Sequence, residues 1–166
     1  RKVLFASSSC VYGNVSPMVE TSASRSSATP YSITKALGED YCRYWSRHHG
    51  LDTVSVRLFN SYGPGESPGP YRNVIPNFFE KAFAGEPILI TGTGDETRDF
   101  TFVEDTVEGM MRAMRSRTEP GDVFNIGSGT GHSIRQLAEI VLRLTGGRSE
   151  VRHVPARNWD TVPHRV

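Results

Sequence analysis

Apolar and polar positions alternate along the chain in blocks that predict strands and helices in turn. The first block, KVLFA at residues 2–6, is a short apolar run typical of a buried strand. A polar loop runs to Thr29, and residues 30–49 then carry a helical pattern that Gly50 ends. Further strands are expected at 53–59, 87–91, 98–102, 122–126 and 150–154, and further helices at 73–85, 104–117 and 133–146. This alternation predicts an α/β fold.

Two glycine-rich segments interrupt the pattern. The loop from Gly63 to Pro70 is followed directly by a helix, so we expect a lid or a substrate loop rather than a linker. The segment GSGTG at 127–131 follows a strand, but it has G-x-G-x-G spacing and not the G-x-G-x-x-G of a dinucleotide-binding turn. We expect an ordinary turn into a helix, with Ser133 and Gln136 as a capping box.

Composition narrows the class of protein. The 166 residues are 37% hydrophobic, as in a globular protein with one core, and the net charge is only +1, without runs of like charge. A nucleic-acid or membrane partner is therefore not expected. Cys10 and Cys42 are too few for a disulfide framework, and His48 and His49 lack further ligands at metal-binding spacing, so no metal is expected. A cytoplasmic location is the expectation.

Tyr31 and Lys35 stand as Y-x-x-x-K on the first predicted helix, so their side chains share one face a turn apart. An ammonium near a phenol favours the phenolate and lowers its pKa from about 10, which makes a general base for an alcohol proton. The pair alone proves little, because tyrosine and lysine are common on helices. It gains weight from hydroxyl-rich segments, SSSC and FNSYG, at the ends of two predicted strands, where ligands of α/β sheets collect.

Five motifs in order, SSSCVYG, PYSITK, VRLFNSYGPG, TRDFTFVED and FNIGSG, closely resemble the extended short-chain dehydrogenase/reductase family of nucleotide-sugar epimerases and dehydratases. The resemblance covers essentially the whole chain. It implies a Rossmann-type parallel sheet domain that carries NAD, plus a smaller α/β domain that binds a nucleotide-diphosphate sugar. It also suggests a homodimer through the helix that begins near Pro30.

The resemblance assigns roles to individual residues. Ser8, Tyr31 and Lys35 match the catalytic set: Tyr31 takes a proton from a sugar hydroxyl, Lys35 tunes it, and Ser8 binds the reacting oxygen. Cofactor contacts are implied for Ser7, Tyr31, Lys35, Leu58 and Phe59, and substrate contacts for Asn60, Asn73, Arg98, Arg157 and Asp160.

The sequence departs from its family at the N-terminal side. The family's G-x-x-G-x-x-G loop is absent, so the chain looks like the C-terminal part of a protein about twice as long. We expect residues 1–62 to complete an NAD-binding Rossmann domain. Residues 63–166 would form mainly the nucleotide-sugar subdomain, with some elements returning to the first sheet. The isolated chain is expected to bind NAD poorly and to lack turnover.

Ser9 and Cys10 bear on the type of reaction. They occupy positions where similar 4,6-dehydratases and decarboxylases carry acidic residues, which favours a 4-epimerase, a reaction that needs no second acid or base. GDP-mannose 3,5-epimerases place a reactive cysteine at the position of Cys10, but their lysine partner is replaced here by Val74. Dehydratase and 3,5-epimerase activities remain the alternatives within enzymes. An inactive nucleotide-sugar-binding remnant is the alternative of another class.

Overall fold

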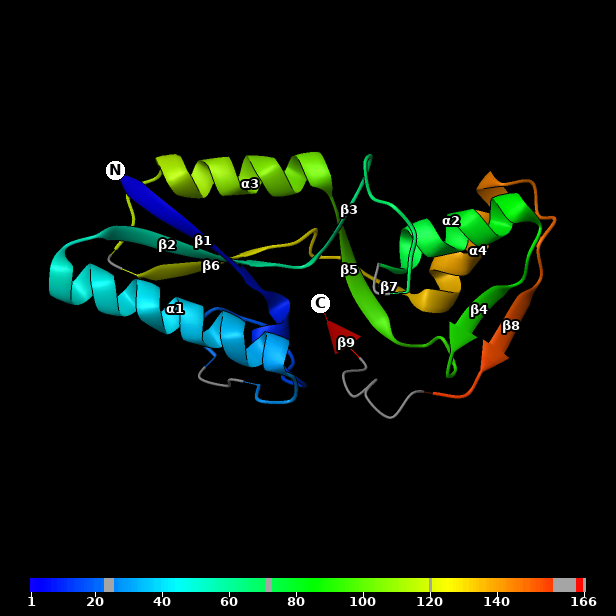
Figure 1. Ribbon diagram of the computed structural model, residues 1–166, viewed down its shortest axis with the longest axis horizontal. Coiled ribbons are helices and arrows are strands. Elements are labelled where there is room, and N and C mark those ends of the chain that lie inside the picture. The colour runs from blue at the N-terminus through cyan, green and yellow to red at the C-terminus, as the bar shows by residue number, and fades with distance from the viewer. Residues whose placement is uncertain (23–25, 71–72, 120, 157–163, 166) are drawn as a thin grey trace.

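The computed structural model describes residues 1–22, 26–70, 73–119, 121–156 and 164–165 (Figure 1). Its strands are β1 (Lys2–Ser8), β2 (Asp52–Leu58), β3 (Asn60–Tyr62), β4 (Ile88–Thr91), β5 (Thr97–Phe102), β6 (Asp122–Ile126), β7 (Gly131–Ser133), β8 (Val151–Val154) and β9 (His164–Arg165). Its helices are α1 (Pro30–His49), α2 (Val74–Ala84), α3 (Val103–Arg115), α4 (Ile134–Leu144) and the short 3-10 helix η1 (Ser9–Tyr12). The predicted α/β class is confirmed.

Strands β1, β2 and β6 form a parallel sheet in the order β1-β2-β6. Ser8 pairs with Leu58, and Leu58 pairs with Ile126, so the three strands end at one level. Helix α1 lies along one face of this sheet and α3 along the other (Figure 1). The carboxyl ends of β1, β2 and β6 therefore form one edge, where ligands of such sheets are bound.

Helix α1 begins and ends where local chemistry dictates. Thr29 and Ser32 form a reciprocal capping box, and Pro30 occupies the first helical position. Gly50 follows the helix in the left-handed conformation, at φ 65°, which a residue with a Cβ adopts only at a cost. The predicted range 30–49 is confirmed. It could be predicted from the sequence because these signals lie within a few residues of each helix end.

The second group of elements surrounds β5. Strand β5 pairs with β3 in parallel through residues 100–102, and with β7 and β9 through residues 97–99. Helices α2 and α4 pack with β4 and β8 around a separate apolar core, at the opposite end of the molecule from the first sheet (Figure 1). This core includes Ile88, Ile90 and Val141, which are fully buried.

Three short strands were not expected from the sequence. Residues 60–62 lie in the FNSYG segment expected at the end of a strand, and residues 131–133 lie in the expected turn into a helix, but they form β3 and β7 because β5 pairs with both. Residues 164–165 form β9, which also pairs with β5. The capping box of Ser133 and Gln136 at α4 is confirmed. Within the described ranges, no helix has both the length and the apolar character needed to cross a membrane.

Candidate functional site

Ser8 lies at the carboxyl end of β1, where the chain turns into η1. Its hydroxyl accepts a hydrogen bond of 3.2 Å from the Cys10 amide and so caps η1. The serine is 7% exposed. The cap fixes Ser8 at the edge of the sheet, the position predicted for the residue that binds the reacting oxygen.

Tyr31 and Lys35 lie in the first turns of α1, which packs against β1 and η1. The Lys35 ammonium lies 5.5 Å from the centre of the Tyr31 ring and donates a 2.8 Å hydrogen bond to the carbonyl of Ala6. The Tyr31 side chain is open to solvent, at 52% exposure. The structure thus places an accessible phenol beside a cation, at the edge of the sheet that carries Ser8.

The residues predicted to line the nicotinamide have internal contacts. Ser7 is buried, and its hydroxyl donates to Glu39 at 2.5 Å. Phe59 is 9% exposed and packs in a cluster with Val11 and Tyr12 of η1, and Leu58 packs against the core beneath α3. Their contact with a cofactor stays a prediction, and for Ser7 the hydroxyl is already engaged within the chain.

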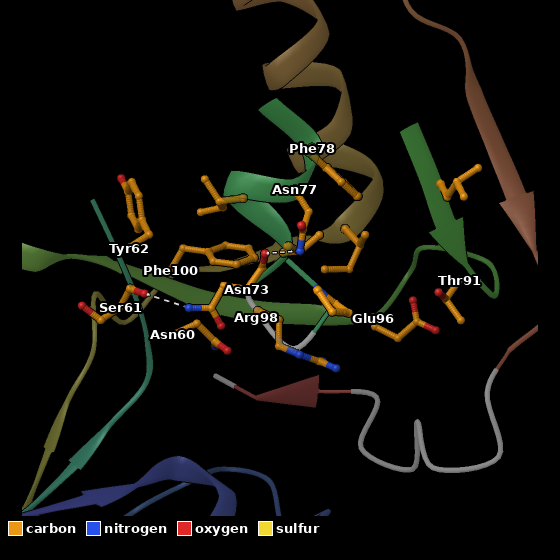
Figure 2. A pocket seen from close by; sticks show the side chains of 15 residues that line it. Asn60, Ser61, Tyr62, Asn73, Asn77, Phe78, Thr91, Glu96, Arg98 and Phe100 are labelled. Atoms are coloured by element: carbon orange, nitrogen blue, oxygen red, sulfur yellow. Dashed lines mark hydrogen bonds between the residues drawn. The ribbon is translucent and has the colours of Figure 1, made fainter. Parts of the chain in front are cut away.

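A pocket of about 370 Å³ opens beside β5, and it brings together three of the predicted substrate residues. Asn60 comes from β3, Asn73 from the residue before α2, and Arg98 from β5. Figure 2 shows their side chains beside β5, with Asn77 and Phe78 reaching toward the pocket from α2. Segments well separated in the sequence therefore supply one polar cavity.

Asn73 departs from the usual behaviour of its position. Asparagine before a helix normally accepts hydrogen bonds from the first turn, but Asn73 makes no such cap. Its amide nitrogen instead donates to Glu66 of the Gly63 to Pro70 loop and, at 3.5 Å, to the carbonyl of Ser61. A residue that lines a pocket and does not make the hydrogen bond usual for its position in a helix is often a functional residue.

Asp99 is a buried residue that binds the turn at Ser128 and Gly129 and the pocket residue Asn60. It is 2% exposed, and its carboxylate accepts bonds from the Ser128 amide and hydroxyl, the Gly129 amide and the Thr101 hydroxyl, at 2.7 to 3.0 Å. Its backbone carbonyl accepts a 3.0 Å bond from the Asn60 amide. A Cβ at Gly127 would lie 2.7 Å from the carboxylate, so this glycine permits the turn to close on Asp99. The segment GSGTG is therefore a turn built around a buried acid.

Some lining residues were missed from the sequence, and two predicted ones cannot be placed. Asn77 and Glu96 also line the pocket. Asn77 lies one helical turn after Asn73, and Glu96 lies two residues before Arg98, so periodicity could have indicated both.

Arg157 and Asp160 lie outside the described residues. Within the described residues, no group of three or more His, Cys, Asp or Glu side chains could hold a metal ion.

Comparison with known proteins shows the family of the chain. The model of the NAD dependent epimerase/dehydratase family matches residues 1–127. The chain belongs to this family. A Rossmann-type fold is shared with solved epimerases and dehydratases of the family, and the predicted resemblance is confirmed.

Individual members of the epimerase/dehydratase family match the chain closely. UDP-N-acetyl-alpha-D-glucosaminuronate decarboxylase of Bacillus cytotoxicus is 38% identical over 99% of this chain and 54% of its own length. The structure of an epimerase from Methanothermobacter thermautotrophicus has a TM-score of 0.93 at 44% identity, over 98% of this chain and 49% of that one. A UDP-N-acetylglucosamine 4-epimerase of Methanobrevibacter ruminantium M1, in complex with UDP-N-acetylmuramic acid, has a TM-score of 0.92 at 32% identity, over 99% and 53%. The chain spans about half the length of these relatives.

Proposed function

We propose that this chain carries the catalytic and nucleotide-sugar-binding parts of an NAD-dependent nucleotide-sugar 4-epimerase. The observation that carries the proposal is the pocket beside β5, in which Asn60, Asn73 and Arg98 meet. The planar guanidinium of Arg98 offers several donors to a diphosphate, and the asparagine amides suit the polar edges of a nucleotide. Asn60 follows β2 by two residues, so the pocket continues from the sheet edge that holds Ser8.

The reaction needs a base, a charge beside it and a donor to the sugar oxygen. Tyr31 takes the proton from the C4 hydroxyl, Lys35 holds a positive charge beside the phenol, and Ser8 donates to the reacting oxygen. Bound NAD would supply the reversible hydride acceptance that this reaction requires. The described residues fit the reactive end of this cofactor, because Tyr31 is accessible and Lys35 lies at the carboxyl end of β1. Tyr31 and Lys35 would hold its ribose.

The choice of 4-epimerisation depends on Ser9 and Cys10. These residues form the first turn of η1, directly after Ser8, and neither carries a carboxylate. Elimination of water needs a further acid and base near the sugar, and these two residues offer no carboxylate for that role. Rotation of a keto sugar followed by return of the hydride does not need them.

A decarboxylase is the second candidate, because the relative from Bacillus cytotoxicus acts on a nucleotide-linked uronic acid according to its name. Dehydration and 3,5-epimerisation are further candidates within enzymes, and a non-catalytic nucleotide-sugar-binding protein is the candidate of another class. The intact set of Ser8, Tyr31 and Lys35 supports catalysis.

The test uses a full-length protein that contains this chain, incubated with UDP-glucose, UDP-N-acetylglucosamine and UDP-glucuronic acid in deuterated water. We expect NMR to show interconversion of C4 epimers without deuterium at C5. Loss of water, deuterium uptake at C5 or release of carbon dioxide would each overturn the 4-epimerase assignment in favour of a named alternative. Binding of UDP without any conversion would favour the non-catalytic protein.

The division of the chain is part of the same proposal. We assign residues 1–62 to the cofactor-binding Rossmann part, and 63–166 mainly to the nucleotide-sugar part. The first sheet and the pocket support this division, and β6 with α3 are the elements that return to the first sheet.

A homodimer through α1 is the proposed assembly of the full-length protein. The outward face of α1 exposes Ile33, Leu37, Tyr41 and Tyr44, which lie three or four residues apart and form an apolar stripe. Sedimentation velocity of the full-length protein and of a Leu37→Glu variant tests this assembly. A sedimentation coefficient that the variant leaves unchanged would contradict it.

A further inference from the structure

A buried ion pair lies directly behind the catalytic residues. Glu39 of α1 and Arg57 of β2 are 1% and 4% exposed. The Arg57 Nε donates to one carboxylate oxygen of Glu39 at 2.9 Å, and its Nη2 donates to the other at 2.8 Å. Replacing such a pair by apolar residues is often neutral or stabilising, so stability alone is a weak reason for burying it.

Ser7 connects this ion pair to the strand that carries Ser8. Its hydroxyl donates at 2.5 Å to Glu39 Oε1, the same oxygen that accepts from Arg57 Nε. Ser7 immediately precedes Ser8, and successive residues of a strand point to opposite faces. The Ser7 side chain is therefore bound to α1 while Ser8 caps η1 at the site.

Lys35 and Glu39 together attach α1 to the end of β1. They lie four residues apart on one face of the helix, and they bind two successive residues of the strand. Lys35 donates to the carbonyl of Ala6, and Glu39 accepts from Ser7. If Lys35 turns toward a ligand, its bond to the Ala6 carbonyl is lost. The bond between Ser7 and Glu39 then still holds the end of β1 to α1.

Arg57 extends these contacts to the turn after Ser8. Its guanidinium lies 4.6 Å from the centre of the Tyr12 ring, and the Tyr12 hydroxyl donates to Asn125 of β6 at 2.8 Å. Burial tends to lower the pKa of Arg57, but the hydrogen bonds and charge of Glu39, with a smaller contribution from the polar group of Tyr12, outweigh it and raise that pKa. Arg57 therefore remains charged at neutral pH.

We propose that Ser7, Glu39 and Arg57 form a positioning unit that fixes Ser8 relative to Tyr31 and Lys35. This inference depends on the proposed function, because it assumes that those three residues react with the sugar. It gives Ser7 a role inside the chain in place of the predicted cofactor contact.

Ser7→Ala in the full-length enzyme is the direct test, because it removes one hydroxyl and leaves the ion pair. A small displacement of a catalytic group is expected to lower kcat roughly 10- to 100-fold, with the KM of the nucleotide sugar within about twofold of the wild type. Thr53→Val is the matched control. The Thr53 hydroxyl likewise binds a strand to α1, because it donates to the Cys42 carbonyl at 3.0 Å. Thr53 lies on β2 opposite Val3, at the end of the sheet away from Ser8. This variant should lose similar stability and keep its kcat.

A second measurement needs no activity. Hydrogen exchange of the Cys10 amide, which donates to Ser8, should become faster in the Ser7→Ala form of the 166-residue chain and not in Thr53→Val. If the full-length wild type does not epimerise sugars but this difference is observed, the proposed 4-epimerase function fails, whereas the placement of Ser8 by Ser7, Glu39 and Arg57 is upheld. The positioning role would be overturned if both variants showed equal exchange or equal kcat. It would also be overturned if weaker NAD binding were the only defect of the Ser7→Ala enzyme.

Discussion

Asp99 illustrates how one residue can build a site without taking part in its chemistry. Its carboxylate fixes the turn at Ser128 and Gly129, and its backbone orients Asn60 at the pocket. The motif TRDFTFVED contains this residue and its neighbour Thr101, but it does not indicate the partners Ser128 and Gly129, which lie about thirty residues further on. A buried acid with several donors is a structural anchor.

Asp99→Ala is expected to destabilise the protein strongly. The substitution leaves the buried amides of Ser128 and Gly129 without an acceptor, so the free energy of unfolding should fall by about 3 kcal/mol in a urea titration. Asp95→Ala is the control, because Asp95 is exposed and pairs with Arg135 at the surface, and its loss should be below about 1 kcal/mol. Equal losses in the two variants would contradict the anchoring role.

Cys42 should show a pH dependence that reflects its burial. Desolvation raises the pKa of this thiol above its ordinary value of 9.0, and the negative charge of Glu39 adds to the effect. The folded state then holds the proton more tightly than the unfolded state. The resulting stabilisation is complete below pH 9.0 and is lost as the pH rises through the higher folded pKa.

Alkylation by iodoacetamide, followed by mass spectrometry between about pH 7 and 11, measures this directly. The midpoint for Cys42 in the folded chain should lie above that in urea, where the thiol is solvated. Coincident midpoints in the two conditions would exclude the effect.

At the scale of elements, the ends of the helices could be predicted from nearby residues, but the pairing of the short strands could not. The capping residues of α1 and α4 lie within a few positions of the helix ends, so both helices could be predicted closely from the sequence. Strands β3 and β7 have three residues each, and they exist because β5 offers them partners. Such short segments carry too few side chains for a period-two pattern, so their assignment needs the tertiary structure.

The contact between α1 and β1 gives a prediction at this scale. Gly38 lies inside α1, where alanine would normally be favoured by about 1 kcal/mol. A Cβ at Gly38 would lie only 2.1 Å from Cζ of Phe5, so the ring must move. Gly38→Ala should therefore lower the free energy of unfolding by about 1 to 3 kcal/mol.

A double-mutant cycle identifies the cause of that loss. In a Phe5→Leu background the ring is absent, and Gly38→Ala should cost little or become stabilising. The same cost in both backgrounds, measured by chemical unfolding, would show that Phe5 is not responsible.

At the scale of the whole molecule, the site is made of separate segments that meet at sheet edges. The family motifs predict site roles for Ser8, Tyr31, Lys35, Asn60, Asn73 and Arg98, and the pocket brings the last three together. The bond from Ser7 to Glu39 and the pairing of Glu39 with Arg57 could not be predicted, because Glu39 in its helix and Arg57 in its strand look like ordinary surface charges in the sequence. Only the packing of α1 on the sheet reveals them.

The two ligand regions should behave differently in the isolated 166-residue chain. The described residues alone already form the pocket beside β5 with Asn60, Asn73 and Arg98 in its lining, so UDP should bind and give saturable heats by calorimetry. The residues proposed for NAD lie at the end of one three-stranded sheet, with Tyr31 52% exposed, and a tightly held cofactor has most of its surface buried. We therefore expect the purified chain to release far less than one NAD per polypeptide on denaturation, measured by chromatography, whereas the full-length protein should release close to one. Because the two ligands are tested on the same preparation, UDP binding shows that the chain is folded when NAD is absent, and stoichiometric NAD in the isolated chain would contradict the prediction.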